Sequence, residues 1–241
     1  MRIVRERIDL ILVQVVVRSC GMTWIVFGAL LAATACHRDP MASAPPAVLV
    51  AEDRLERLRF VDPRRFGIAA ARGSVTLRGD RVETVPRRAP LYFPPARTWV
   101  AGVVRIQAVE TMCPVSQIEA AAAAVVELQN RDTISALLLD FDPPPQLRDC
   151  FRGLVRTIRK RLPASRPLAI LARPESCSTD PWMSGLPVQE VIPKGRGEFS
   201  EPLCSWSRAL ESGQAGDAGK RVYWFSPEPW TEGLVERLRA Y

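Results

Sequence analysis

The chain has 241 residues, of which 47% are apolar and 24% are charged, and its net charge is +7. This composition is typical of a folded domain with a sizeable core and excludes a mostly disordered chain. The arginines are scattered rather than gathered in a basic run, so the charge indicates a solvated surface and no nucleic-acid binding is expected.

The single histidine, His37, precedes the predicted body of the chain. Catalytic Ser-His-Asp triads, Cys-His pairs and histidine-based metal sites all need an imidazole. None of these is therefore expected in the body, and there is no Cys-x-x-Cys motif that would indicate a zinc site. The sequence predicts neither a metal nor a cofactor.

Residues 1–36 have the pattern of an export segment. Arginines flank a first apolar run, and a nearly uncharged stretch over 22–35 ends in small residues before Cys36. These residues resemble a lipoprotein signal, in which Cys36 would be lipidated after cleavage. Ordinary signal cleavage, an uncleaved anchor and a cytosolic protein are the alternatives, and Met22 is a second candidate for the start of translation. The export routes would place the chain in the cell envelope, attached to a membrane by its N-terminus or secreted.

Residues 37–47 contain Pro40, Pro45 and Pro46 and predict a linker to a body over 48–241. Short apolar runs in this body predict strands, and longer amphipathic runs predict helices. Strands are expected at 48–51, 66–77, 82–85, 100–106, 134–139, 168–172, 188–192 and 222–225. Helices are expected at 117–130, 146–162 and from 232 to 240, with Ser116 and Thr231 as N-caps of the first and last.

The Gly79-Asp80 turn predicts a hairpin between the second and third runs. The other strands alternate with helices, which predicts βαβ units and a parallel sheet that curls toward a barrel. The expected fold is thus an α/β protein with a parallel β/α barrel of TIM type. It is expected to be incomplete, with about seven strands instead of eight and with the first strand missing at its N-terminal edge.

An ordered set of segments resembles the bacterial domain-of-unknown-function family numbered 3142. These segments are 66–70, 103–106, 136–142, 167–172, 177–182, 186–193 and 221–230. The resemblance implies a barrel similar to those of glycoside hydrolases, on an exported or lipid-anchored protein, without an established activity. This chain departs from the family pattern in lacking its aromatic first strand, in the prolines after Asp142, and at Glu175 and Lys194.

Active sites of such barrels lie at the C-terminal ends of the strands. The charged residues predicted there are Glu52, Arg105, Asp140, Asp142, Glu175 and either Glu190 or Lys194. Asp140 and Asp142 are expected to share one face because side chains alternate along a strand. In chitinase-like barrels the acid glutamate stands two residues after such an Asp-x-Asp motif, where this chain has Pro144.

Two main hypotheses follow. In the first, the barrel is degenerate and binds a glycan or a partner without catalysis, and the two aspartates bond Arg105, Arg173 or backbone amides. In the second, Asp140 and Asp142 assist glycan hydrolysis, with Glu52 or Glu175 as the acid. Arg105 and Trp182 are the candidate ligand-binding residues. An exposed Trp182, Trp206 or Trp230 would stack on a sugar ring, although buried packing is the commoner position of tryptophan.

Four cysteines lie in the body. Cys177–Cys204 is the expected disulfide, since both residues fall in long loops and export permits disulfides. Cys150 lies on the apolar stripe of its predicted helix and is expected to be a buried free thiol. For Cys113 the sequence leaves open both a free thiol and a disulfide.

Overall fold

The computed structural model describes residues 41, 43–94, 97–110, 113–130, 134–173, 182–194, 206–207 and 221–238. The chain separates into two units, Met1–Asp39 and Pro40–Tyr241, and all described residues belong to the second. The predicted export segment with Cys36 therefore lies outside the described residues. Within the described part of the chain, no helix is both long and apolar enough to cross a membrane.

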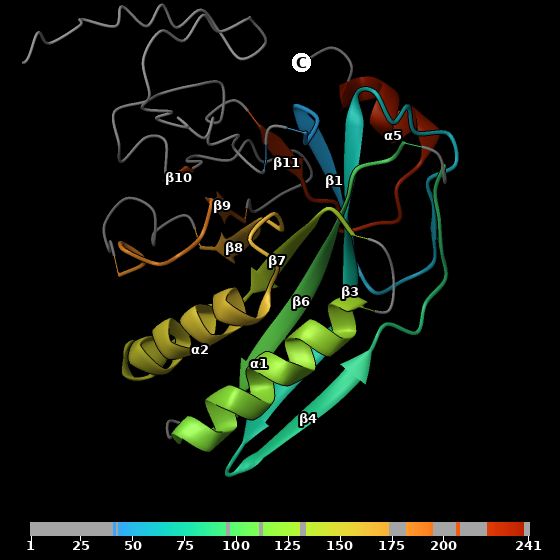
Figure 1. Cartoon of the computed structure of the whole chain (residues 1–241). Helices are drawn as coiled ribbons and strands as arrows, with labels where there is room; N and C mark the ends of the chain where they lie inside the picture. The colour runs from blue at the N-terminus through green and yellow to red at the C-terminus, as the bar shows by residue number, and fades with distance from the viewer. Residues whose placement is uncertain are drawn as a thin grey trace, which may run out of the picture. The chain divides into compact units, whose positions relative to one another are not determined.

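The second unit is built around a sheet of parallel strands with helices packed on its outer face (Figure 1). Seven strands run parallel in the order β9-β8-β7-β6-β3-β1-β11, so that the last strand pairs with the first. The predicted α/β barrel with about seven parallel strands is confirmed at this level. The strands are β1 (Ala47–Ala51), β3 (Phe66–Arg78), β6 (Val100–Ala108), β7 (Ala136–Asp140), β8 (Leu168–Ala172), β9 (Glu190–Pro193) and β11 (Val222–Trp224).

The first strand of the sheet, β1, is paired on both sides. β1 pairs with β3 along its whole length and with β11 from Ala47 to Leu49. Its residues 48–51 are apolar and buried, which suits a strand covered on both faces. The two remaining ends of the parallel set are β9 and β11. Only the short antiparallel strand β10 (Trp206–Ser207), which pairs with β9, is described between them.

β3 extends beyond the barrel and pairs antiparallel with β4 (Arg81–Pro86), which forms the predicted hairpin. Gly79 in its turn has a positive φ of 57°, which favours glycine. The register of β3 against β6 shifts between Ala71 and Gly73, a bulge that redirects the strand as it leaves the barrel. A separate parallel pair, β2 (Glu56–Arg57) and β5 (Leu91–Tyr92), was not predicted.

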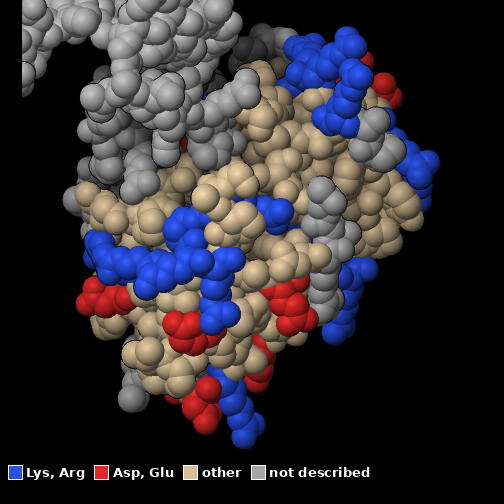
Figure 2. Space-filling model, viewed as in Figure 1, with Lys and Arg blue, Asp and Glu red and all other residues tan. Residues whose placement is uncertain are grey.

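The helices cover the outer face of the sheet. They are α1 (Val115–Asn130), α2 (Arg148–Arg161) after the 3-10 turn η1 (Pro145–Leu147), and α5 (Glu232–Arg237). Phe151, Leu154 and Val155 on the predicted apolar stripe of α2 are buried against this face. On the side of the molecule shown in Figure 2, acidic side chains lie beside basic ones, and Arg161 pairs with Glu119 across the two helices at 2.7 Å.

The predicted N-caps have different outcomes. The Thr231 side chain accepts a hydrogen bond from the Leu234 amide at 3.2 Å and caps α5, as predicted. Ser116 lies inside α1 instead of capping it. The helix begins earlier because the Pro114 carbonyl already accepts bonds from the amides of Gln117 and Ile118.

The barrel interior is filled by small and medium apolar side chains and is closed at the N-terminal ends of the strands. Met41 and Trp99 are buried there beside Val48, Ala69 and Tyr223. Met41 is therefore part of the barrel core, although it falls within the range 37–47 that the sequence predicts as a linker. A Cβ on Gly67 would come within 2.8 Å of the Trp99 ring, so a side chain at this position would disturb the packing.

A buried polar cluster links the two strands at the ends of the parallel set. The Tyr223 hydroxyl of β11 donates to Glu190 Oε2 of β9 at 2.9 Å. The Arg221 guanidinium pairs with Glu190 and donates to the Met41 carbonyl at 2.8 Å. Burial, reinforced by the Glu190 carboxylate, raises the pKa of Tyr223 well above its ordinary value. Glu190 thus lies at the closed end of the barrel, not at the predicted site.

A disulfide joins Cys113 to Cys150, with Cα atoms 5.8 Å apart. It links the segment before α1 to the first turn of α2, on the same helical layer. The prediction of a free thiol at Cys150 is wrong, because helix packing places a second cysteine beside it that sequence spacing does not reveal. Cys177 and Cys204 lie outside the described residues.

Candidate functional site

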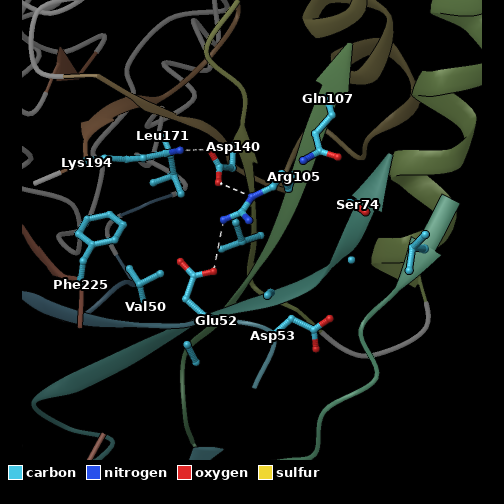
Figure 3. Close-up of a pocket in the computed structure, with 15 residues that line it drawn as sticks. Val50, Glu52, Asp53, Ser74, Arg105, Gln107, Asp140, Leu171, Lys194 and Phe225 are labelled. Atoms are coloured by element: carbon cyan, nitrogen blue, oxygen red, sulfur yellow. Dashed lines mark hydrogen bonds and ion pairs between the residues drawn. The ribbon is translucent and has the colours of Figure 1, made fainter. Parts of the chain in front are cut away.

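The C-terminal ends of the parallel strands surround a pocket with a volume of about 250 Å³ (Figure 3). This is the position at which barrels of this class carry their sites. Residues from β1, β3, β4, β6, β7, β8, β9 and β11, or from the positions just after them, contribute to it. They are Val50, Ala51, Glu52, Asp53, Ala71, Gly73, Ser74, Val85, Val103, Arg105, Gln107, Asp140, Leu171, Lys194 and Phe225.

Four charged side chains form a continuous row across the pocket (Figure 3). Arg105 Nε lies 3.2 Å from Asp140 Oδ2, and Arg105 Nη2 lies 3.4 Å from Glu52 Oε2. Lys194 pairs with the other oxygen of Asp140. The Asp140 side chain is only 7% exposed, whereas Arg105 is 51% and Lys194 34% exposed. Asp140 thus holds two cations whose outer surfaces face the pocket.

Strand alternation places these residues on the inner face of the sheet. Ala101 and Val103 of β6 point into the barrel, and Arg105 follows two residues later on the same face. Leu138 precedes Asp140 in the same manner on β7. Register then brings the two together, since Arg105 pairs directly with Asp140 in the β6–β7 ladder.

Asp142 continues the inner face of β7 beyond the end of the strand and pairs with Arg173, which follows β8. The expected contacts of the two aspartates with Arg105 and Arg173 are therefore observed. Glu175, the other predicted acid, lies outside the described residues.

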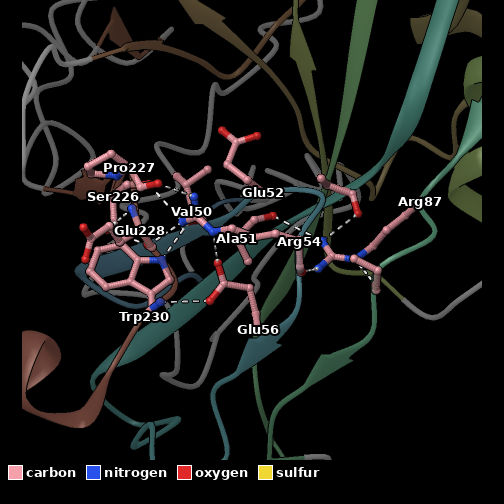
Figure 4. Close-up of polar contacts among 12 residues, drawn as sticks. Val50, Ala51, Glu52, Arg54, Glu56, Arg87, Ser226, Pro227, Glu228 and Trp230 are labelled. Carbon is pink, nitrogen blue, oxygen red and sulfur yellow. Dashed lines mark hydrogen bonds and ion pairs between the residues drawn. The ribbon is translucent and has the colours of Figure 1, made fainter.

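The loop after β1, which carries Glu52 and Asp53, is held on one side by Arg87. This guanidinium donates to the carbonyls of Arg54 at 2.7 Å and Ala89 at 2.8 Å, with longer bonds to one carbonyl of β1 and one of β3 (Figure 4). Burial lowers the pKa of Arg87. Asp53 Oδ1 also accepts bonds from the amides of Arg88 and Ala89, so the Asp53 side chain serves the loop.

Arg54 holds the same loop on the other side, against the segment after β11. It donates to the carbonyls of Ser226, Pro227 and Glu228 and pairs with Glu56 Oε1 at 2.8 Å (Figure 4). Glu56 is fully buried, and its second oxygen accepts a bond from the Trp230 amide at 2.9 Å. These contacts fix Glu52 in position before any ligand binds.

Trp182 does not lie at the pocket. It is 8% exposed, packs on Phe151 with ring centroids 5.6 Å apart and belongs to the core beneath α2. The expectation of an exposed ring at Trp182 is thus corrected, because the described segment 182–188 packs its apolar side chains into the core that α2 covers. The aromatic side chain at the pocket is Phe225, which directly follows β11.

Sequence reasoning did not single out Phe225, Gln107, Ser74 or Asp53. Phe225 ends one predicted strand and Asp53 lies just after another, so their position was a usable signal. Gln107 and Ser74 required knowledge that β3 and β6 extend beyond the barrel. Among the described residues, no three His, Cys, Asp or Glu side chains gather so that they could hold a metal ion.

The pocket combines hydrogen-bond donors and acceptors with an apolar wall. Arg105 and Lys194 donate, the carboxylates of Glu52 and Asp140 accept, and Val50, Leu171 and Phe225 form a largely apolar side. Such a surface suits a ligand that is polar at its rim and apolar on one face.

No family model, curated protein or solved structure matches the chain. The resemblance to the family numbered 3142 stays an expectation from the segments quoted above.

Proposed function

We propose that this domain binds a neutral glycan at the barrel mouth without cleaving it. The observation that supports this proposal is the row of charged side chains beside the Phe225 ring, formed by Glu52, Arg105, Asp140 and Lys194. Sugar hydroxyls donate and accept hydrogen bonds, so they match a row that alternates carboxylates with cations. The C–H face of a sugar ring matches the apolar side of the pocket.

Binding without hydrolysis is supported by the carboxylates. Glycoside hydrolysis needs one protonated acid and one base or nucleophile. Glu52 contacts Arg105, Asp140 contacts two cations, and Asp142 contacts Arg173, so each described candidate carboxylate is already engaged by a cation. The position of the acid in chitinase-like barrels is occupied by Pro144, which cannot donate a proton.

We further propose that the protein is exported to the cell envelope and that its barrel is a degenerate relative of the TIM type. The Cys113–Cys150 disulfide supports export, because such bonds persist mainly in oxidising compartments. The signal-like pattern before Cys36 is the second support. Labelled palmitate should enter the wild-type chain but not Cys36→Ala. Equal labelling of both would contradict lipidation at Cys36.

The test of glycan binding is calorimetric titration of the full chain with neutral oligosaccharides built from glucose or N-acetylglucosamine. At least one is expected to bind, with no new reducing ends after prolonged incubation. Phe225→Ala should weaken binding by at least about fivefold, from the lost aromatic contact. Tyr92→Ala, which removes a partly exposed aromatic side chain outside the pocket, is the matched control. Absence of binding would overturn the proposal, and product formation would favour the hydrolase instead.

A further inference from the structure

A second hollow adjoins the pocket at the C-terminal strand ends (the mouth pocket) and extends it into a groove. It has a volume of about 600 Å³. Arg105, Gln107, Asp140 and Lys194 line both hollows, so the two lie next to each other. The additional lining residues are Thr76, Arg78, Glu83, Ile106, Ala108, Val109, Phe141, Asp142 and Pro144.

The unequal lengths of the strands create this groove. β3 stops pairing with β1 at Ala70, but it continues along β6 as far as Leu77. The β6–β7 ladder ends at Asp140, so β6 also projects beyond its other neighbour. The projecting parts of β3 and β6, backed by the β4 hairpin, form the floor, and the segment after β7 forms a side.

Among the described residues, the groove meets the barrel interior on one side and opens to solvent on the other. At the mouth pocket, Val50, Val103 and Leu171 belong to the apolar interior that fills the barrel below. A chain therefore cannot continue through the barrel. At the other end, the lining residues Arg78 and Glu83 are each 54% exposed, so the groove leads to solvent there.

The charges along the groove are balanced. Three basic residues (Arg78, Arg105 and Lys194) and three acidic residues (Glu83, Asp140 and Asp142) line it. Arg78 pairs with Glu83 at 3.4 Å, in addition to the pairs at the mouth. A polyanion would need an excess of cations, which the lining does not offer. The uncharged side chains of Thr76 and Gln107 offer further hydrogen bonds to hydroxyl groups.

From this geometry we propose that the site binds the end of a neutral oligosaccharide chain. The terminal sugar occupies the mouth pocket and the following sugars lie along the groove. This inference rests on the proposed glycan binding and adds chain-end recognition and length dependence to it. It predicts that a chain without a free end at the mouth is excluded.

The experiment titrates the full chain with a length series of the cello- or chito-oligosaccharide that binds, from the monosaccharide to the hexasaccharide. Affinity should rise by at least about tenfold between one and three sugars and then level off. Cyclic oligosaccharides of the same sugar should not bind. Thr76→Trp, which fills the groove, should remove the gain with length. Thr84→Trp, in the same hairpin but outside the groove lining, should preserve the gain.

Three results would overturn the inference. Equal affinity for one sugar and for long chains, tight binding of cyclic chains, or an unaltered length series in Thr76→Trp would each contradict it while leaving glycan binding intact. Absence of binding by every neutral sugar would instead overturn the proposed function itself. The two failures are therefore distinguishable within one set of titrations.

Discussion

Removal of the Cys113–Cys150 disulfide offers a quantitative test of the helical layer. The bond joins residues with a sequence separation of 37 and ties the start of α1 to the start of α2. Closing a loop of this size removes conformational entropy from the unfolded chain, which corresponds to about 4 kcal/mol of stability. For a chain of this length, that predicts a decrease of roughly 8–16 °C in the melting temperature.

The perturbation is the double variant Cys113→Ala with Cys150→Ala, melted beside the wild type without reductant. A double variant is more specific than reduction, because a reductant acts on every disulfide of the chain. Mass spectrometry after thiol alkylation should find Cys113 and Cys150 unalkylated in the wild type, because their disulfide protects both sulfur atoms. Two alkylated thiols at these positions, or a melting temperature unchanged by the double substitution, would refute the cross-link or its stabilising role.

Two further predictions concern stability. Gly73→Ala should destabilise the chain by several kcal/mol (~3 kcal/mol or more), because φ is +142° and the added Cβ would meet the Val85 carbonyl oxygen at 2.2 Å. Gly233→Ala in α5, where nothing lies within 4 Å, should stabilise it by about 0.5–1 kcal/mol, and urea unfolding compares the two. The raised pKa of Tyr223 means that folding favours the protonated phenol. Its contribution to the free energy of unfolding is therefore fully present below pH 10 and is lost as the pH rises further. Tyr223→Phe should be less stable at pH 8 by about 1.5–3 kcal/mol through the lost bond to Glu190, yet should lose less stability between pH 9 and 11; an equal alkaline loss would contradict this.

Much of the framework could be predicted because its signals are local. The apolar run at 168–172 matches β8 from end to end, and Thr231 caps the last helix as its sequence position indicates. Asp140 and Asp142 share a face because alternation along a strand depends only on spacing. These features need no information about which elements meet in space.

The predictions that failed concern features that depend on contacts between residues far apart in the sequence. The pairing of β1 with β11 joins residues almost at opposite ends of the described chain, so the sequence alone could not show that this edge is closed. The partner of Cys150 and the burial of Trp182 are set by helix packing. Glu190 and Lys194 lie at opposite ends of one short strand, and only the strand bounds assign Lys194 to the mouth.

The network behind the mouth was also out of reach of sequence reasoning. Arg54 and Arg87 bond mainly to backbone carbonyls, which every sequence contains, so no residue pattern marks their targets. Their contacts become visible only when the loops after β1, β4 and β11 are brought together. The charged side chains of the mouth pocket could therefore be predicted from the sequence, but the hydrogen bonds that hold its loops could not.

The most direct test of the central claim compares Arg105→Gln with Arg161→Gln in glycan titrations of the full chain. Arg105 joins Glu52 to Asp140 at the mouth, whereas Arg161 pairs with Glu119 on the helical layer, so both substitutions remove one cation from an ion pair. The account predicts that Arg105→Gln weakens binding by at least about tenfold, that Arg161→Gln binds like the wild type, and that no chain releases sugar. Equal affinities of the two variants, or release of sugar by the wild type, would contradict non-catalytic binding at the barrel mouth.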